Sequence, residues 1–156
     1  MDVREQLRHD HVKALAELDG IAREADAGRC QARLARLRRA WMIHALAEET
    51  VVYRGLEGLA PGHRADERFV EHELVEGMFE KLTHARTGTL EFQARINVLR
   101  ELMARHIQAE EGKLFADLAE RYSAEELVAM GEQFVLASDK LGLLEDVKKS
   151  EMRKAA

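Results

Sequence analysis

Residues 90–119, LEFQARINVLRELMARHIQAEEGKLFADLA, decide the fold of this chain. Apolar side chains recur there at steps of three and four residues, which is the period of one face of an α-helix. His106 and Glu110 share that face and lie one helical turn apart. The face consists of Ile96, Leu99, Met103, His106, Glu110 and Leu114. The stretch therefore predicts a long amphipathic helix that turns a histidine and a carboxylate toward the core.

The same period predicts three further long helices before this one. The first covers about residues 3–26 and is expected to end near Gly28. The second carries an apolar stripe from Leu34 to Val51 and is expected to end at Gly55, Gly58 and the Pro61-Gly62 pair. The third covers about residues 64–86. Their apolar faces also contain histidines, namely His11, His44 and His72.

Ser123 and Glu126 have the spacing of a capping box, which predicts a shorter helix over about residues 124–137. The polar residues that follow, up to residue 156, are expected to fray. Abundant Ala, Leu, Glu and Arg favour helices over strands. We expect an all-α, antiparallel up-down four-helix bundle with a short C-terminal fifth helix, forming one domain over residues 1–156 with a core over about 3–120.

Charge and composition disfavour several classes of function. The formal net charge of −5 is unusual for a nucleic-acid-binding protein. No 18-residue apolar stretch or signal-peptide core is present, so we expect no membrane association. Cys30 is the only cysteine, which excludes a disulfide within the chain and agrees with a reducing, cytoplasmic location.

Histidine–glutamate pairs spaced four residues apart form the candidate site. The pairs are His44 with Glu48, His72 with Glu76, and His106 with Glu110. The spacing alone has little weight, since a fourth such pair, His63 with Glu67, begins in a predicted turn. Position adds weight, because the four inward histidines fall near the middle of their helices, and midpoints meet at one height in an antiparallel bundle. The remaining histidines, His9, His63 and His84, are predicted at the surface.

A metal centre explains this convergence better than separately satisfied core histidines beside exposed glutamates, which is the alternative. Unpaired buried carboxylates would each cost several kcal/mol. A shell of imidazoles and carboxylates suits iron, manganese or zinc and disfavours copper(I). More than six ligands imply two ions.

The order of these residues resembles the hemerythrin-like (HHE cation-binding) family. The likeness lies in RHDHVKAL (8–15), HALAEETVVYRGL (44–56), EHELVEGMFEKL (71–82) and HIQAEEGKLFADL (106–118). It implies two iron ions bridged by an oxo or hydroxo group and by carboxylates. The nitrogen ligands would be His11, His44, His72 and His106, and the bridging carboxylates Glu48 and Glu110.

Two further residues, Glu76 and Tyr53, remain open in this comparison. An oxygen-carrying member of the family has a histidine where this chain has Glu76, which is a ligand, an acceptor for an imidazole N–H or a surface acid. Tyr53 is predicted to pack or hydrogen-bond near the site, or to bind iron. Glu49 and Glu111 point about 100° away from the ligand carboxylates on an ideal helix, which predicts that they face solvent.

The resemblance implies a protein that binds or converts dioxygen, hydrogen peroxide or nitric oxide, with an unknown electron donor. Peroxidase-like, catalase-like or nitric oxide-reducing turnover is compatible with it. The alternative is an iron- or oxygen-responsive sensor that acts through a protein partner, because ligand binding couples to stability. A metal-free interaction bundle is a third possibility.

Overall fold

The computed structural model describes residues 1–56 and 65–155, and these residues form helices and turns without a strand. The elements are α1 (Val3–Ala22), α2 (Ala27–Glu48), the π-helical turn η1 (Glu49–Tyr53), α3 (Ala65–Thr83), α4 (Leu90–Ala109), the π-helical turn η2 (Glu110–Leu114), α5 (Phe115–Arg121) and α6 (Ala124–Ala155). The predicted all-helical class is confirmed. The residues of the predicted turn that contains Gly58, Pro61, Gly62 and His63 lie outside the described residues.

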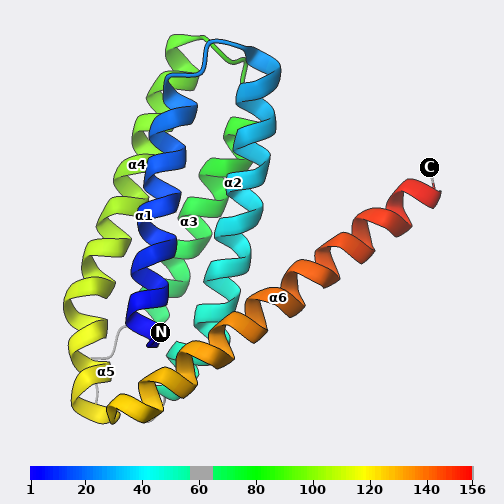
Figure 1. Cartoon of the computed structure of the whole chain (residues 1–156). Helices are drawn as coiled ribbons and strands as arrows, with labels where there is room; N and C mark the ends of the chain where they lie inside the picture. The colour runs from blue at the N-terminus through cyan, green and yellow to red at the C-terminus, as the bar shows by residue number, and fades with distance from the viewer. Residues whose placement is uncertain (57–64, 156) are drawn as a thin grey trace.

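Helices α1 to α4 lie side by side, and α6 crosses one end of them before running outward (Figure 1). Helix α1 contacts α2, α4 and α6, while α3 contacts α2 and α4. The four helices therefore surround a shared interior in which each has two neighbours. Within the described part of the chain, no helix combines the length and apolar character needed to cross a membrane.

Side-chain caps explain where the helices begin. Asp2 accepts hydrogen bonds from the backbone N–H groups of Arg4 and Glu5 and starts α1. The prediction that the first helix reaches residue 26 is wrong, because α1 ends at Ala22. Asp26 instead accepts the N–H of Arg29 at 2.7 Å and begins α2, so that the predicted terminator Gly28 is its second residue.

The capping box at Ser123 is present, and α6 starts at Ala124 as predicted. Glu126 accepts the N–H of Ser123 at 2.8 Å, and the Ser123 hydroxyl accepts the N–H of Glu126 at 3.3 Å. The predicted end near residue 137 is wrong, since the helix continues to Ala155. Arg39 of α2 supports this extension by donating to the Gly142 carbonyl at 2.9 Å and to Asp146 at 2.7 Å.

The apolar interior consists of two clusters. One cluster joins the C-terminal half of α1 and the N-terminal half of α2 to α3 and α4, around Leu18, Leu34, Phe79 and Leu99. The other joins the N-terminal half of α1, the C-terminal end of α2 and the turns η1 and η2 to α5 and α6, around residues such as Phe134. The buried histidines and glutamates lie between the two clusters, so that each side of this polar layer is closed by apolar packing.

Gly131 allows α6 to approach the start of α1 closely. A Cβ atom at this position would lie 2.6 Å from the carbonyl oxygen of Met1 and 3.0 Å from the nitrogen of Val3. We expect Gly131→Ala to lower the free energy of unfolding by roughly 1–3 kcal/mol, because backbone atoms must move. Gly77→Ala is the matched control, since nothing lies within 4 Å of that Cβ. It should raise stability by about 0.5–1 kcal/mol through helix propensity. Urea unfolding of both variants measures the contrast, and equal effects would contradict the close approach.

Candidate metal centre

Two histidines and two glutamates form the centre of the polar layer. Nε2 of His72 lies 3.1 Å from Nε2 of His106 and 3.7 Å from Oε2 of Glu48. Nε2 of His106 lies 3.2 Å from Oε1 of Glu110. One ligand atom from each of the four residues lies within 4.8 Å of all the others. This is the spacing of side chains that share metal ions, and all four residues are buried.

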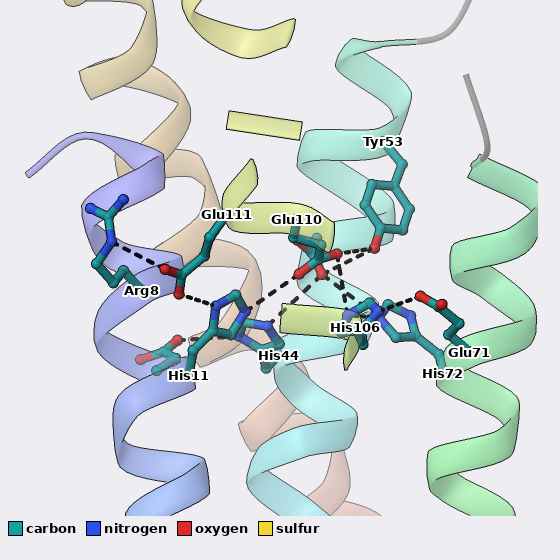
Figure 2. Close-up of polar contacts among 11 residues, drawn as sticks. Arg8, His11, His44, Tyr53, Glu71, His72, His106, Glu110 and Glu111 are labelled. Atoms are coloured by element: carbon teal, nitrogen blue, oxygen red, sulfur yellow. Dashed lines mark hydrogen bonds and ion pairs between the residues drawn. The ribbon is translucent and has the colours of Figure 1, made fainter. Parts of the chain in front are cut away.

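His11 and His44 extend this group on the side of α1 and α2. Nε2 of His11 lies 3.4 Å from Oε2 of Glu110, and Nε2 of His44 lies 3.9 Å from Oε2 of Glu48. The two imidazole rings have centroids 5.0 Å apart. The structure therefore brings together all six residues predicted as ligands. The four histidines and Glu110 lie at one height of the bundle (Figure 2).

Four atoms of this group are buried and have no hydrogen-bond partner among the described residues. They are Nε2 of His11, Nε2 of His44, Oε1 of Glu48 and Oε2 of Glu110. Buried polar groups are normally paired, and leaving one unpaired costs about 1–3 kcal/mol. Imidazole nitrogens and carboxylate oxygens are ligands of iron, manganese and zinc. The donor set thus fits metal ions, which would satisfy all four atoms at once.

The two buried carboxyl groups titrate in opposite directions. Burial raises the pKa of Glu48 well above its ordinary range, and the negative charge of Glu110 raises it further. Burial also acts to raise the pKa of Glu110, but the hydrogen bond with His106 and the nearby imidazole of His11, 3.4 Å away, hold it well below the ordinary value. Without metal, one carboxyl group is therefore protonated and the other is ionised.

The pKa values of His72 and His106 are also shifted in opposite directions. Burial lowers the pKa of His72 to about 3, and the charge on His106 contributes. Burial alone would lower the pKa of His106, but its hydrogen bonds to Glu110 and Glu71 raise it to about 10. Without metal, a protonated His106 therefore donates to a neutral His72 and pairs with an ionised Glu110.

A ring of four outer carboxylates supports the imidazoles through their Nδ1 atoms. Each carboxylate comes from the helical segment next to that of its histidine. The four contacts are Asp10 to His44 at 3.4 Å, Glu49 to His72 at 2.7 Å, Glu71 to His106 at 2.9 Å and Glu111 to His11 at 3.1 Å. Such contacts direct each Nε2 lone pair inward and raise the basicity of the ring.

The prediction that Glu49 and Glu111 face solvent is wrong. Both side chains are largely buried, with exposed fractions of 23% and 28%. Glu111 also accepts from Nε of Arg8 at 3.4 Å, which links the surface of α1 to His11 (Figure 2). An ideal isolated helix does not include its neighbours. Glu49 and Glu111 each contact a histidine on the adjacent helix instead of facing solvent.

Tyr53 contacts both glutamates of the centre. Its hydroxyl lies 2.5 Å from Oε1 of Glu110 and 3.3 Å from Oε2 of Glu48. On an ideal α-helix Tyr53 would point well away from Glu48, but η1 separates the two residues. A π-helical turn closes its hydrogen bonds five residues apart, which returns Tyr53 to the side of Glu48. Burial, together with the charge of Glu110 and its hydrogen bond, raises the pKa of the phenol, so Tyr53 stays protonated and donates.

Trp41 lies under three of the histidines. Its ring stacks on His44 with centroids 5.5 Å apart, and it meets His106 and His72 edge-on at 5.7 Å and 6.4 Å. The side chain is buried. Trp41 therefore separates the imidazoles from the apolar cluster of α1 to α4 and limits their reorientation.

Other predicted residues lie away from the centre. Glu76 forms an ion pair with Arg38, whose Nε lies 2.9 Å from Oε1 of Glu76. Its carboxylate therefore neither joins the metal centre nor accepts an imidazole N–H. His9 and His84 are exposed, as predicted.

Sequence reasoning overlooked Asp10, Glu71 and the roles of Glu49 and Glu111. A signal for them was present, since each acid directly adjoins a predicted ligand in the sequence. The sequence pattern does not show that each acid contacts a histidine on a different helix.

The hemerythrin HHE cation-binding domain model matches residues 2–118. The chain belongs to this family. The match covers most of the chain, including all six central residues and the four outer carboxylates, and the family description names the cation-binding property to which the buried donor set also points. This hemerythrin HHE protein therefore has both the family pattern and the buried His and Glu cluster needed to bind metal.

Among curated proteins, the chain is 23% identical over 141 residues to a DNA nickase from Nostoc sp. (strain PCC 7120 / SAG 25.82 / UTEX 2576). The aligned region is 90% of this chain and 40% of that relative, so the hemerythrin HHE protein spans less than half of the relative's length. No solved structure matches the chain.

Proposed function

We propose that this chain is a non-haem di-iron protein that binds or converts a small oxidant, namely dioxygen, hydrogen peroxide or nitric oxide. The two irons would be held by His11, His44, His72 and His106, with Glu48 and Glu110 as bridging carboxylates together with an oxo or hydroxo bridge. The proposal includes one domain built as an antiparallel up-down four-helix bundle, to which α6 is attached. It also includes a cytoplasmic setting, which a single cysteine favours.

The observation that carries the proposal is the set of four buried, unpartnered ligand atoms on His11, His44, Glu48 and Glu110. An interaction bundle would gain nothing from this arrangement, whereas two metal ions satisfy it fully. Two ions also suit this donor set better than one, because four imidazole nitrogens and both oxygens of two carboxylates offer eight donor atoms, and a single ion rarely takes more than six.

When bound, the irons supply the redox chemistry. The residues of the chain prepare the site for them. The outer carboxylates fix the tautomer of each imidazole, Tyr53 donates a hydrogen bond to the two central carboxyl groups, and Trp41 with the two apolar clusters excludes water. The low polarity of these surroundings strengthens every charge interaction within the centre.

Metal content and the near-ultraviolet and visible spectrum test the proposal. Protein from iron-supplemented cells should contain about two irons per chain with oxo-bridge absorption. His106→Ala and His44→Ala should each lose at least one iron and the absorption, and both variants should keep the helical circular dichroism signal. His84→Ala is the matched control, because His84 is 74% exposed and pairs with the surface residue Glu80. A stably folded, colourless wild-type protein without metal would refute the di-iron proposal.

An iron- or oxygen-responsive sensor is the second candidate, and the outer half of α6 favours it. This segment leaves Leu143, Leu144, Val147 and Met152 exposed, as a partner-binding helix would. A sensor should change the hydrogen-exchange protection of α6 when iron is removed and show negligible turnover. An enzyme should convert peroxide or nitric oxide with α6 unchanged.

DNA nicking is not part of the proposal. The net charge of −5 works against binding to the phosphate backbone, and the match covers 40% of the nickase.

A further inference from the structure

Arg68 is a buried cation without an ionic partner. The residue is 8% exposed, although an arginine is rarely buried unless it is paired. Its Nε has no hydrogen-bond partner, and its guanidinium forms no ion pair with the residues that the structure describes. Glu71, three residues further along α3, contacts Nδ1 of His106 instead, at 2.9 Å. Arg68 therefore keeps an uncompensated positive charge inside the bundle.

Arg68 lies beside the metal centre, on the side of Tyr53. It precedes His72 by one helical turn, so the two residues share one face of α3. Cζ of Arg68 lies 5.7 Å from the centroid of the Tyr53 ring, and that ring stacks on His72 with centroids 5.9 Å apart. The hydroxyl of Tyr53 lies 2.5 Å from Glu110. One aromatic ring therefore adjoins both the guanidinium and two of the predicted ligands.

The charge of Arg68 acts on groups of the centre. Burial has the largest effect on the pKa of His72 and on that of Tyr53, and the charge of Arg68 acts to lower both. Apolar surroundings screen charges weakly, so the same field acts on any positive charge that is placed at the centre. A cation beside a site for cations is unfavourable for both charges. Arg68 therefore opposes the metal ions that the donor set attracts.

We propose that Arg68 limits the positive charge that the metal centre can hold. It weakens the binding of metal ions, and it favours the reduced, less positive state of bound irons, which raises their reduction potential. The outer carboxylates act in the opposite sense, since Glu49 and Glu71 add negative charge beside His72 and His106. The inference rests on the proposed function in one respect, namely that metal ions occupy the centre.

Zinc binding to the metal-free, full-length chain tests the effect on affinity without redox chemistry, by competition with a chromophoric chelator. Arg68→Met keeps a long apolar side chain and removes the charge. We expect it to bind Zn²⁺ about tenfold more tightly than the wild type, because a buried repulsion is lost. Arg68→Lys keeps the charge and should bind like the wild type. Arg54→Met is the matched control, because Arg54 follows Tyr53 in the sequence but is exposed, and solvent screens its charge. Its affinity should change by less than about twofold.

Two further measurements separate this effect from packing. The urea midpoint of metal-free Arg68→Met should be unchanged or raised, because removal of an unpaired buried charge does not cost stability. Spectroelectrochemistry of the iron-loaded protein should give a lower reduction potential for Arg68→Met than for the wild type and Arg68→Lys.

Equal zinc affinities, or equal potentials, in the wild type and Arg68→Met would overturn the inference. A lowered urea midpoint together with weaker zinc binding would assign Arg68 a structural role instead. A chain that shows the expected zinc contrast but never loads iron would refute the di-iron proposal and still support the effect of Arg68.

Discussion

Glu110→Gln is expected to destabilise the metal-free protein by about 3 kcal/mol, whereas Glu48→Gln should change its stability by less than about 1 kcal/mol. The two glutamates are equally buried and undergo the same substitution. They differ in charge, because the raised pKa of Glu48 keeps it protonated and the lowered pKa of Glu110 keeps it ionised beside protonated His106. At position 48 a glutamine replaces a protonated acid of similar shape. At position 110 it removes one of the two carboxylates that pair with protonated His106 and leaves Glu71 alone to balance that charge. Urea unfolding at pH 7 with a chelator present measures both changes.

The pH dependence of stability provides a second measurement of the same ion pair. The pKa of His106 is raised to about 10 in the folded chain, above its value when unfolded. Its contribution to stability is therefore complete below about pH 6.5 and is lost as the pH rises toward 10. The metal-free wild type should show this loss, and Glu110→Gln should show a smaller one. Equal destabilisation by the two glutamine substitutions, with the same pH slope, would contradict the assigned charges.

Glu71→Ala is expected to weaken metal binding by about 10- to 100-fold without removing a ligand. Glu71 lies 2.9 Å from Nδ1 of His106, and that hydrogen bond lowers the pKa of the carboxyl group. Its loss frees the imidazole to rotate and makes Nε2 a weaker ligand. Competition with a chromophoric chelator gives the dissociation constant. Glu71→Gln should have an intermediate effect, since the amide oxygen can still accept the N–H.

Glu101→Gln is the control for this prediction, because Glu101 is exposed on α4 and lies outside the outer ring. An unchanged dissociation constant in Glu71→Ala would show that the outer contact does not position His106. Loss of helical signal in the same variant would instead assign Glu71 a role in folding.

The bundle and its six central residues could be predicted because helical periodicity is a local property. Apolar residues three and four apart identify a buried face, and a histidine on that face is brought to the core with it. His44 with Glu48 and His106 with Glu110 follow from this spacing together with the position of each histidine near the middle of its helix. Spacing is not sufficient to identify a site residue. Glu76 has the same spacing from His72 but pairs with Arg38.

The remaining parts of the site depend on features that an ideal helix does not contain. Tyr53 reaches the centre because η1 inserts a wider turn after Glu48, and no composition rule identifies that turn. The outer carboxylates depend on contacts between helices, such as that of Asp10 with His44. The polar composition after residue 137 predicts fraying, but polar residues also form exposed helices, and α6 continues to Ala155.

The two apolar clusters make the packing of the bundle independent of the four central histidines, since neither cluster includes them. Apolar burial on both sides of the polar layer therefore stabilises the helices without a contribution from the donor atoms. Under the proposed function, the empty donor set would then be held in place before any ion binds.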